Sequence, residues 1–422
     1  MNILLIGNGF DLAHCLPTKY TQFLDFILIV GKYTTNKSRK DVILKNKINE
    51  ELNQLFGDAV NLETPGIIIH FDEAEKFIDK NIWVEYMLIK KKELKEGWID
   101  FEKEISDVIQ SLDDDMSKES KSEEPNPKVT NPNENKSKDP IKKTIKILSN
   151  SAILKKHKYN DIITFENLRD RLVNDLNRLI LLLELYLSHF VYKIKPNYLS
   201  SDIKIINPEY ILSFNYTDTY RFMYKEDNPN YKDISFIHGS IRGIDDTKPA
   251  NIVLGIDEYL KEDRKDKDID FIAFKKYYQR ILKRTGSEYK NWLGEIHTEF
   301  FNFINNNDSR KNKVEKLLGE DKNIILKNVN FELIDELGYK HKRSKLHIFG
   351  HSLDVTDKDI LKELILDEFI DTTVYYFREQ DLPEKIANLV KIIGQDELIK
   401  RTSAPYNTIS FQLQRAMQRV SI

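Results

Sequence analysis

The chain of 422 residues contains a single cysteine, Cys15, and therefore cannot form an intrachain disulfide. This scarcity is typical of a protein from a reducing compartment. The longest apolar runs, at 26–30 and 179–183, are far shorter than the roughly 20 residues that a bilayer-spanning helix needs. The first residues also lack the basic segment and long apolar run of a secretory signal peptide. We therefore expect a cytoplasmic protein without a membrane-spanning segment.

The chain has no large excess of charge of either sign. Lysine and arginine total 65, aspartate and glutamate total 68, and the net charge is -3. This balance argues against nucleic acid as the partner, because nucleic-acid-binding proteins concentrate positive charge on their surface. Apolar residues make up 40% and charged residues 32% of the chain, which predicts a filled core under a charged surface.

Several widespread signatures are absent. The sequence has neither G-x-x-x-x-G-K-[ST] nor G-x-S-x-G, which argues against a P-loop NTPase and an α/β-hydrolase nucleophile elbow. Leu12 stands where the dinucleotide fingerprint has its third glycine, so a hydride-transferring Rossmann dehydrogenase is disfavoured. His347 and His351 are four residues apart, but Gly350 and the strand-like context argue against a helical zinc site. We expect no metal.

Short β-branched or aromatic runs alternate with helical stretches along the chain. Strands are expected at 2–6, 210–215, 235–238, 251–256, 345–349 and 372–377. Helical spacing covers much of 40–110 and the stretches 271–304 and 358–369, and a leucine stripe along 167–192 predicts a packing face. The run 67–69 fits either a strand or a helix. This alternation predicts an α/β fold with a mostly parallel, Rossmann-like sheet.

We expect one domain over residues 1–422 with large helical insertions. Its core segments are predicted at about 1–30, 205–257 and 344–380, and the insertions at about 31–200 and 258–343. Residues 117–140 hold four prolines and one large apolar residue, Val129. Such a segment buries too little surface to offset its chain entropy, so we expect a disordered loop there.

A glycine turn follows the first expected strand. It consists of Gly7, Asn8, Gly9, Phe10 and Asp11. A turn of this kind lets backbone N–H groups approach a phosphate closely, and the N-terminus of the following helix adds partial positive charge. A ligand-free strand-to-helix turn explains the same residues, so the turn alone does not decide between the two interpretations.

Small or polar residues also follow three later strands. They are, in chain order, Asn215 and Thr217, His238 and Gly239, and Gly350 and Ser352. Asn215 could bind a ribose hydroxyl or a water, or else Asn215 or Thr217 could cap a helix. His238 suits general-base chemistry because histidine titrates near neutral pH, although a lone histidine is more often structural. Ligands bind outside the carboxyl ends of parallel strands, so four such ends on one edge predict a nucleotide site.

These blocks resemble a known family. Residues 2–14 and 16–20, followed by the blocks at 98–102, 214–217, 237–239 and 350–353, closely resemble the AbiH family of bacterial abortive-infection proteins. The blocks occur in the same order, and the match runs from residue 1 to about 360. AbiH-like proteins resemble, more distantly, the sirtuin-like (SIR2) superfamily, in which a glycine loop, an asparagine block, a histidine-glycine block and a late Gly-x-Ser block surround NAD.

The resemblance implies a SIR2-like fold and a role for each block. Implied contacts are Gly7 and Gly9 with the pyrophosphate, Asn215 and His238 with the nicotinamide ribose, and Gly350 and Ser352 with the adenosine side. Asp11 replaces a serine common in sirtuins, and Thr217 replaces an aspartate. The four-cysteine zinc module is absent as well, which argues against protein deacylation.

The resemblance thus implies an antiphage effector with NAD+ as its substrate, cleaved at the nicotinamide–ribose bond. His238 would be the base, and Asn215 would position water or ribose. One alternative is a module that senses NAD, ADP-ribose or another nucleotide without turnover and gates a partner. Another is a nuclease or RNA-acting toxin. The sequence leaves open whether the chain forms a homo-oligomer or responds to a phage-derived activator or partner protein.

Overall fold

The computed structural model describes residues 1–35, 42–93, 99–120, 165–241, 251–256 and 269–420. The chain divides into two compact units. Unit 1 comprises Met1–Leu16, Pro196–Asn251 and Arg284–Ile422, and unit 2 comprises Pro17–Lys195 and Ile252–Lys283. Residues 17–30, predicted as core, therefore belong to unit 2, and 284–343, predicted as an insertion, belong to unit 1.

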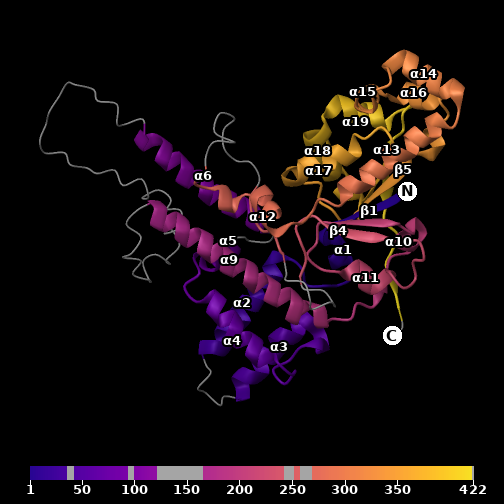
Figure 1. Ribbon diagram of the computed structural model, residues 1–422. Coiled ribbons are helices and arrows are strands. Elements are labelled where there is room, and N and C mark those ends of the chain that lie inside the picture. Colours follow the sequence, from indigo (N-terminus) through magenta and orange to yellow (C-terminus); the bar gives the residue numbers. More distant parts are fainter. Residues whose placement is uncertain (36–41, 94–98, 121–164, 242–250, 257–268, 421–422) are drawn as a thin grey trace, which may run out of the picture. The chain divides into compact units, whose positions relative to one another are not determined.

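Unit 1 is built on six parallel strands (Figure 1). Their order across the sheet is β4 (Asp233–Phe236), β3 (Tyr210–Ser213), β1 (Asn2–Ile6), β5 (Ser344–Phe349), β6 (Ile370–Tyr376) and β7 (Ile409–Leu413). The chain runs outward from β1 to β3 and β4, then returns to the other side of β1 for the last three strands. This is the doubly wound order, which reverses direction between β1 and β5. The predicted α/β fold with a mostly parallel sheet is confirmed.

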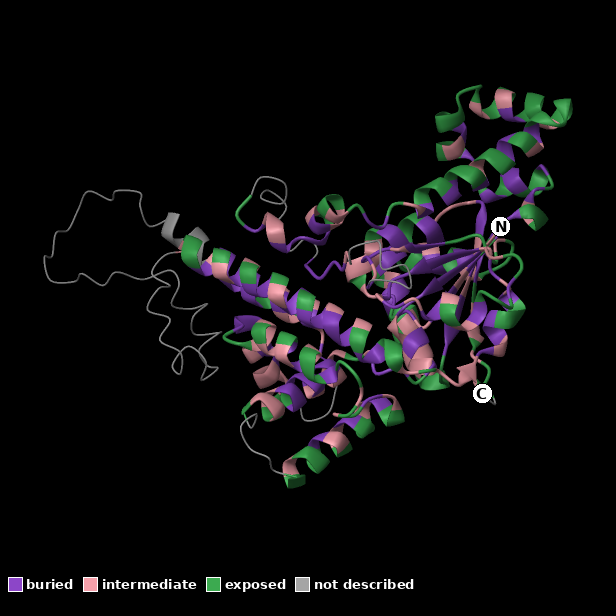
Figure 2. Cartoon of the chain, turned by 60° about the horizontal axis from the view of Figure 1, so that its bottom comes forward, coloured by how far each residue is buried: buried purple, intermediate pink, exposed green. Residues whose placement is uncertain are grey.

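Both faces of this sheet are covered, because successive side chains of a strand point to opposite faces. Ile3 and Leu5 of β1 enter one core cluster, and Leu4 and Ile6 enter the other. Figure 2 shows the resulting pattern, with buried strands between helices that are exposed on their outer sides. The apolar strands predicted from the sequence are therefore fully buried elements of a two-sided sheet.

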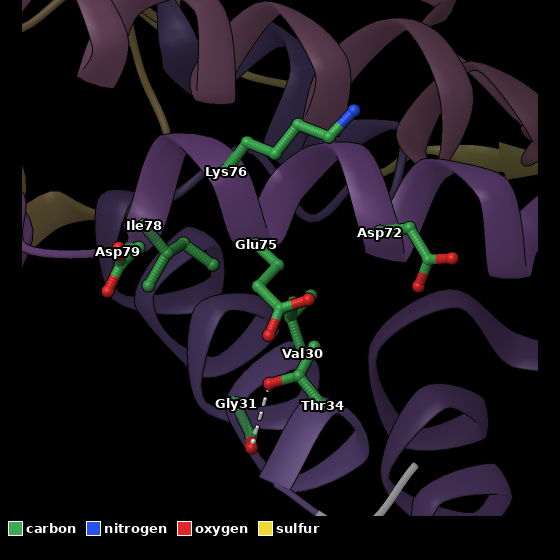
Figure 3. Close-up of a pocket in the computed structure, with 8 residues that line it drawn as sticks. All are labelled: Val30, Gly31, Thr34, Asp72, Glu75, Lys76, Ile78 and Asp79. Carbon is green, nitrogen blue, oxygen red and sulfur yellow. Dashed lines mark hydrogen bonds between the residues drawn. The ribbon is translucent and has the colours of Figure 1, made fainter.

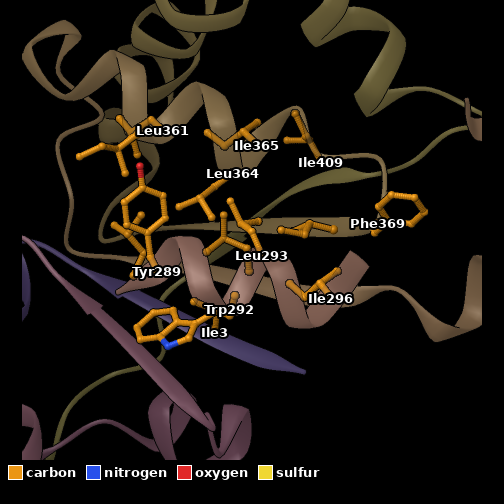
Figure 4. Close-up of a cluster of buried hydrophobic side chains, with 14 of the residues drawn as sticks. Ile3, Tyr289, Trp292, Leu293, Ile296, Leu361, Leu364, Ile365, Phe369 and Ile409 are labelled. Carbon is orange, nitrogen blue, oxygen red and sulfur yellow. The ribbon is translucent and has the colours of Figure 1, made fainter. Parts of the chain in front are cut away.

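The first face packs against α13 (Tyr289–Asn305), α17 (Lys358–Ile365), α18 (Leu382–Ile393) and α19 (Gln395–Thr402). Figure 4 shows Trp292 and Leu293 of α13 in the same cluster as Leu361 and Leu364 of α17. The second face packs against α1 (Asn8–Ala13), α10 (Ser201–Ile206) and α11 (Thr219–Tyr224). Unit 1 also contains α14 (Asp308–Leu318), α15 (Lys322–Asn328) and α16 (Phe331–Glu336), which add side chains to the first cluster, and an antiparallel pair of β2 (Tyr198–Leu199) with β8 (Gln418–Arg419).

The regular secondary structure in the described residues of unit 2 is helical, apart from the isolated bridge between Ile256 and Lys275. Its helices are α2 (Tyr20–Thr35), α3 (Val42–Phe56), α4 (Ile67–Ile78), α5 (Ile82–Glu93), α6 (Phe101–Ser120), α9 (Phe165–His189) and α12 (Lys276–Lys283). The leucine stripe of α9 is buried, and this helix packs against α4 and α5, which confirms the predicted packing face. The ambiguous run 67–69 begins α4. The predicted loop 117–140 lies outside the described residues, apart from 117–120 at the end of α6.

The prediction of a strand at 251–256 is wrong, because these residues form no regular strand. Ile256 alone forms an isolated parallel bridge, with Lys275. The side-chain amide of Gln279 accepts from the N–H of Leu254 at 3.2 Å and donates to its carbonyl at 3.0 Å. Buried backbone groups need hydrogen-bond partners, and here a side chain at α12 supplies them in place of a neighbouring strand. A buried apolar run is therefore not sufficient evidence for a strand.

Candidate functional site

Four strands of unit 1 end in register. The register pairs Ile6 with Ser213 and with Phe349, and it pairs Ser213 with Phe236. The residues that leave the sheet after these four positions therefore emerge along one edge. They comprise the glycine turn, Asn215, His238 and the Gly350–Ser352 loop. This edge includes the point between β1 and β5 at which the strand order reverses, and ligands bind outside such points in doubly wound sheets.

The glycines bring two loops into backbone contact. The N–H of Gly9 donates to the carbonyl of Gly350 at 2.8 Å, and that of Gly7 donates to Phe349 at 3.3 Å. A β-carbon at Gly9 would lie 2.7 Å from the Gly350 oxygen, and one at Gly7 would lie 2.7 Å from the α-carbon of His351. Real β-carbons do not approach other atoms this closely. These positions therefore require glycine for packing between the loops, whatever ligand they contact.

Replacing Gly350 with alanine is expected to destabilise unit 1 by about 1–3 kcal/mol. Gly350 has a φ of 68°, and a β-carbon there would lie 2.2 Å from the backbone nitrogen of Phe10. The matched control is Gly294→Ala in α13, where a β-carbon meets nothing within 4 Å and alanine should stabilise the helix by roughly 0.5–1 kcal/mol. Denaturant unfolding of both variants tests this. A Gly350→Ala protein as stable as the wild type would contradict it.

Asp11 is a buried acid beside two threonines. The hydroxyl of Thr217 donates to Oδ2 of Asp11, and the hydroxyl of Thr219 donates to that of Thr217 at 3.2 Å. Burial raises the pKa of Asp11 from 3.8 to about 6, although the nearby Thr217, Thr219 and Asn215 partly offset this increase. Its Oδ1 is buried and accepts no hydrogen bond from any described residue. Asp11 is therefore a buried acid whose pKa lies below neutral pH and whose described hydrogen bond is made by only one of its two carboxylate oxygens.

Asn215 joins the end of β3 to the glycine turn. Its side-chain amide donates to the carbonyl of Gly7 at 3.0 Å. Its own N–H donates to the hydroxyl of Ser213 at 3.2 Å, and that hydroxyl donates back to the Asn215 carbonyl. The structure thus holds Asn215 in one orientation beside β1. Gly239, in the loop after the neighbouring strand β4, adopts a φ of 73°, and a β-carbon there would lie 2.0 Å from the carbonyl oxygen of Asn251.

A carboxylate lies between two histidines at this edge. Nε2 of His238 is 3.1 Å from Oδ1 of Asp357, and Nε2 of His351 is 3.4 Å from Oδ2 of the same residue. The ring of Phe214 packs edge-on against both imidazoles, with centroids 5.5 Å and 4.4 Å away. All four side chains are largely buried. His238 therefore has an ordered hydrogen-bonding partner, Asp357, which the sequence pattern does not predict.

The sequence does not single out Asp357 as a site residue, because it stands directly before a helix. It occupies the N-cap of α17, and an aspartate before a helix is most simply a cap. The same explanation is correct for Asp354, whose Oδ1 accepts from the N–H of Thr356 at 3.0 Å. Asp357, in contrast, makes no side-chain capping hydrogen bond. The position of an aspartate before a helix in the sequence therefore does not distinguish a helix cap, such as Asp354, from a residue that faces histidines, such as Asp357.

Other predicted residues have different surroundings. The Phe10 ring is fully buried in the core cluster on the second face of the sheet, which gives this side chain a packing role. Asn8 is the first residue of α1 and is half-buried. Ser352 is exposed, and its hydroxyl accepts from the N–H of Asp354 at 3.3 Å. Its loop is tied to α18, where Asn388 donates to the Ser352 carbonyl at 3.1 Å.

Two further histidines in unit 1 are structural. His14 is buried, with Nδ1 2.7 Å from the Phe10 carbonyl and Nε2 2.8 Å from the Tyr224 hydroxyl. Burial lowers its pKa to about 4. Burial likewise lowers the pKa of His347, on β5, to about 4. In the described ranges, no group of three or more His, Cys, Asp or Glu side chains is arranged to hold a metal ion.

Two surface hollows lie away from the predicted residues. One hollow, in unit 2, has a volume of about 650 Å³ and lies between α2 and α4. Figure 3 shows its lining residues, among them Asp72, Glu75 and Lys76 of α4. A second, of about 510 Å³, is lined by charged residues of α17 and Lys290 in unit 1. Neither includes a residue of the candidate site. None of the helices in the described part of the chain has the length and apolar character needed to cross a membrane.

Comparison with known proteins gives one match. No curated protein and no solved structure matches the chain. The family model described as "Bacteriophage abortive infection AbiH" matches residues 3–377. This interval begins in β1, includes all the strand ends described above and ends directly after β6. The chain therefore belongs to the bacteriophage abortive infection AbiH family.

Proposed function

We propose that this AbiH-family protein acts in abortive infection by hydrolysing NAD+ at the bond between nicotinamide and ribose. The observation that carries the proposal is the row of strand ends at the reversal point of the sheet. It includes the glycine turn, Asn215 and His238. Dinucleotides bind at this position in doubly wound folds. Membership of the AbiH family supports the antiphage role.

Cleavage of this bond places few demands on a protein. Nicotinamide is cationic while it is attached to ribose and leaves as a neutral base, so no general acid is needed. An oxocarbenium-like state develops on the ribose, and a water oxygen bonds to its C1′ as the C1′–N electron pair departs with nicotinamide. One proton must be removed from that water. The protein must therefore anchor the dinucleotide, exclude bulk water and supply one base.

Three residues of unit 1 can meet these demands. His238 is 7% exposed, so its imidazole can accept the proton from water in a largely dry environment. The Asn215 amide, held beside the glycine turn, can orient the water or the ribose. Oδ1 of Asp11 can accept a hydrogen bond from a ribose hydroxyl, because the burial of this carboxylate makes a donor from the ligand favourable.

The direct test is release of nicotinamide from NAD+ by the purified full chain, followed by chromatography, together with NAD+ levels in expressing cells during phage infection. The proposal expects stoichiometric nicotinamide and ADP-ribose. Tight binding of NAD+ or ADP-ribose without turnover would support a nucleotide-sensing module in its place. Neither binding nor turnover, in protein assayed with and without phage lysate, would contradict both functions.

Replacing Asn215 with alanine is expected to lower the rate of nicotinamide release on the order of 10²-fold, because misplacement of a reacting group costs about that much. His341→Ala is the matched control, since His341 is exposed and belongs to the same unit. The rate constants of both variants are compared by initial-rate measurements. Equal activity of Asn215→Ala and the wild type would remove Asn215 from the mechanism.

A further inference from the structure

Asp357 is placed for a role other than helix capping. It stands at the N-cap of α17 without bonding the helix through its side chain. Three positions earlier in the same turn region, Asp354 already caps the short 3-10 helix at Val355–Asp357. The Asp357 carboxylate is instead directed at two imidazoles, and only 11% of its side chain is exposed. A capping role therefore does not explain its position.

The protonation of His351 is determined by its own loop. Its Nδ1 accepts a hydrogen bond from the N–H of Leu353 at 2.9 Å. An imidazole nitrogen that accepts carries a lone pair, so the ring proton of neutral His351 is on Nε2, which is 3.4 Å from Oδ2 of Asp357. His351 therefore faces the carboxylate as a donor, and protonation at Nδ1 would break the bond to Leu353.

The hydrogen bond from Leu353 to His351 requires an unfavourable backbone conformation at Leu353. Leu353 has a φ of 62°, which costs a residue with a side chain about 1–2 kcal/mol. This conformation turns its N–H toward His351. Lys385 of α18 donates to the His351 carbonyl at 2.7 Å, and the side-chain amide of Asn388 donates to the Ser352 carbonyl. Unfavourable backbone conformations that the surroundings enforce are common at functional sites.

The carboxylate in turn determines the tautomer of His238. An ionised carboxylate only accepts hydrogen bonds, so at 3.1 Å it accepts from the Nε2–H of His238. The lone pair of the neutral imidazole is then on Nδ1, and a proton taken from water is accepted there. The imidazolium that results is stabilised by Asp357, which keeps its negative charge and receives no proton.

We propose that Asp357 is the positioning residue of His238, fixing its Nε2–H tautomer, and that His351 holds Asp357 in place. The catalytic part of this inference rests on the proposed function, whereas the tautomer of His238 does not depend on it. Two independent readouts follow. One is the protonation pattern of the imidazole, and the other is the turnover of NAD+.

The first readout is an NMR spectrum of the full chain labelled with isotopic nitrogen at its nine histidines. Two-bond proton–nitrogen correlations distinguish the two neutral tautomers, and loss of one signal set in His238→Gln assigns that residue. We expect the Nε2–H tautomer in the wild type and the Nδ1–H tautomer in Asp357→Asn, where an amide can donate to Nε2. A wild-type spectrum with Nδ1–H at His238 would overturn the inference, whatever the Asp357→Asn spectrum shows.

The second readout is kinetic. In Asp357→Asn, kcat for nicotinamide release should fall roughly 10²–10⁴-fold, with KM little changed, because the tautomer is wrong while the binding groups remain. Asp354→Asn is the control, since asparagine caps as well as aspartate, and it should retain both the tautomer and kcat. An Asp357→Asn protein with the wild-type tautomer would refute the inference. Absence of NAD+ turnover in the wild type would refute the proposed function and leave the tautomer test valid.

Discussion

Substitution of His238 by alanine is expected to lower kcat for nicotinamide release by about 10²–10⁴-fold, the contribution typical of a general base. The reason is that Asp357 orients the His238 imidazole, whereas Nδ1 of His351, the other imidazole beside Asp357, already accepts a hydrogen bond from its own loop. Without it, the attacking water would have to lose its proton to bulk solvent, from which the site is largely closed. Initial rates with NAD+ measure the loss.

The binding of NAD+ should survive this substitution. Backbone hydrogen bonds hold the glycine turn to the end of β5 and the loop after it, and the Asn215 side chain is bonded to the carbonyl of Gly7. None of these contacts involves the imidazole. Calorimetry should therefore give a similar Kd for His238→Ala and the wild type, and His341→Ala, with its exposed ring, should keep wild-type kcat. An active His238→Ala protein would show that another group is the base, and weakened binding would assign His238 to ligand contact.

The sheet edge was predictable because each strand is an apolar run that stops at a small or polar residue. The runs before Gly7 and Asn215 are buried on both faces, which is the property that the sequence pattern reports. The edge strand β7 was not predicted, although Ile409, Phe411 and Leu413 alternate with polar residues. Its alternation is short and lies between loops, where periodicity is weak evidence.

The pairing of Asp357 with His238 was not predictable, because the two residues are 119 positions apart. Their contact depends on the register of β4, β3, β1 and β5 and on the unusual turn at Leu353, which a hydrophobic pattern does not encode. The raised pKa of Asp11 has the same origin. Asp11 is buried beside the loop after β3 and the start of α11, a distant part of the chain, and hydrogen bonds from Asn215 and Thr219 of that part offset some of the increase.

The Asp11→Asn substitution should remove a pH-dependent loss of stability. The pKa of Asp11 is 3.8 in a solvated chain and about 6 in the folded protein. Between these values the folded state keeps a proton that the unfolded state has released, so the free energy of unfolding falls as pH rises through this window. The full loss is about 3 kcal/mol, because each pKa unit corresponds to roughly 1.4 kcal/mol. Below pH 3.8 the loss is absent.

Denaturation midpoints of the wild type and Asp11→Asn should therefore diverge from pH 4.5 to pH 7.5, with the variant gaining about 2 kcal/mol relative to the wild type across that interval. Thr217→Val provides the converse control. It removes a donor that lowers the pKa of Asp11, so its stability should fall more steeply with rising pH than that of the wild type. Parallel plots of stability against pH for Asp11→Asn and the wild type would show that Asp11 has the same pKa in the folded and the unfolded protein.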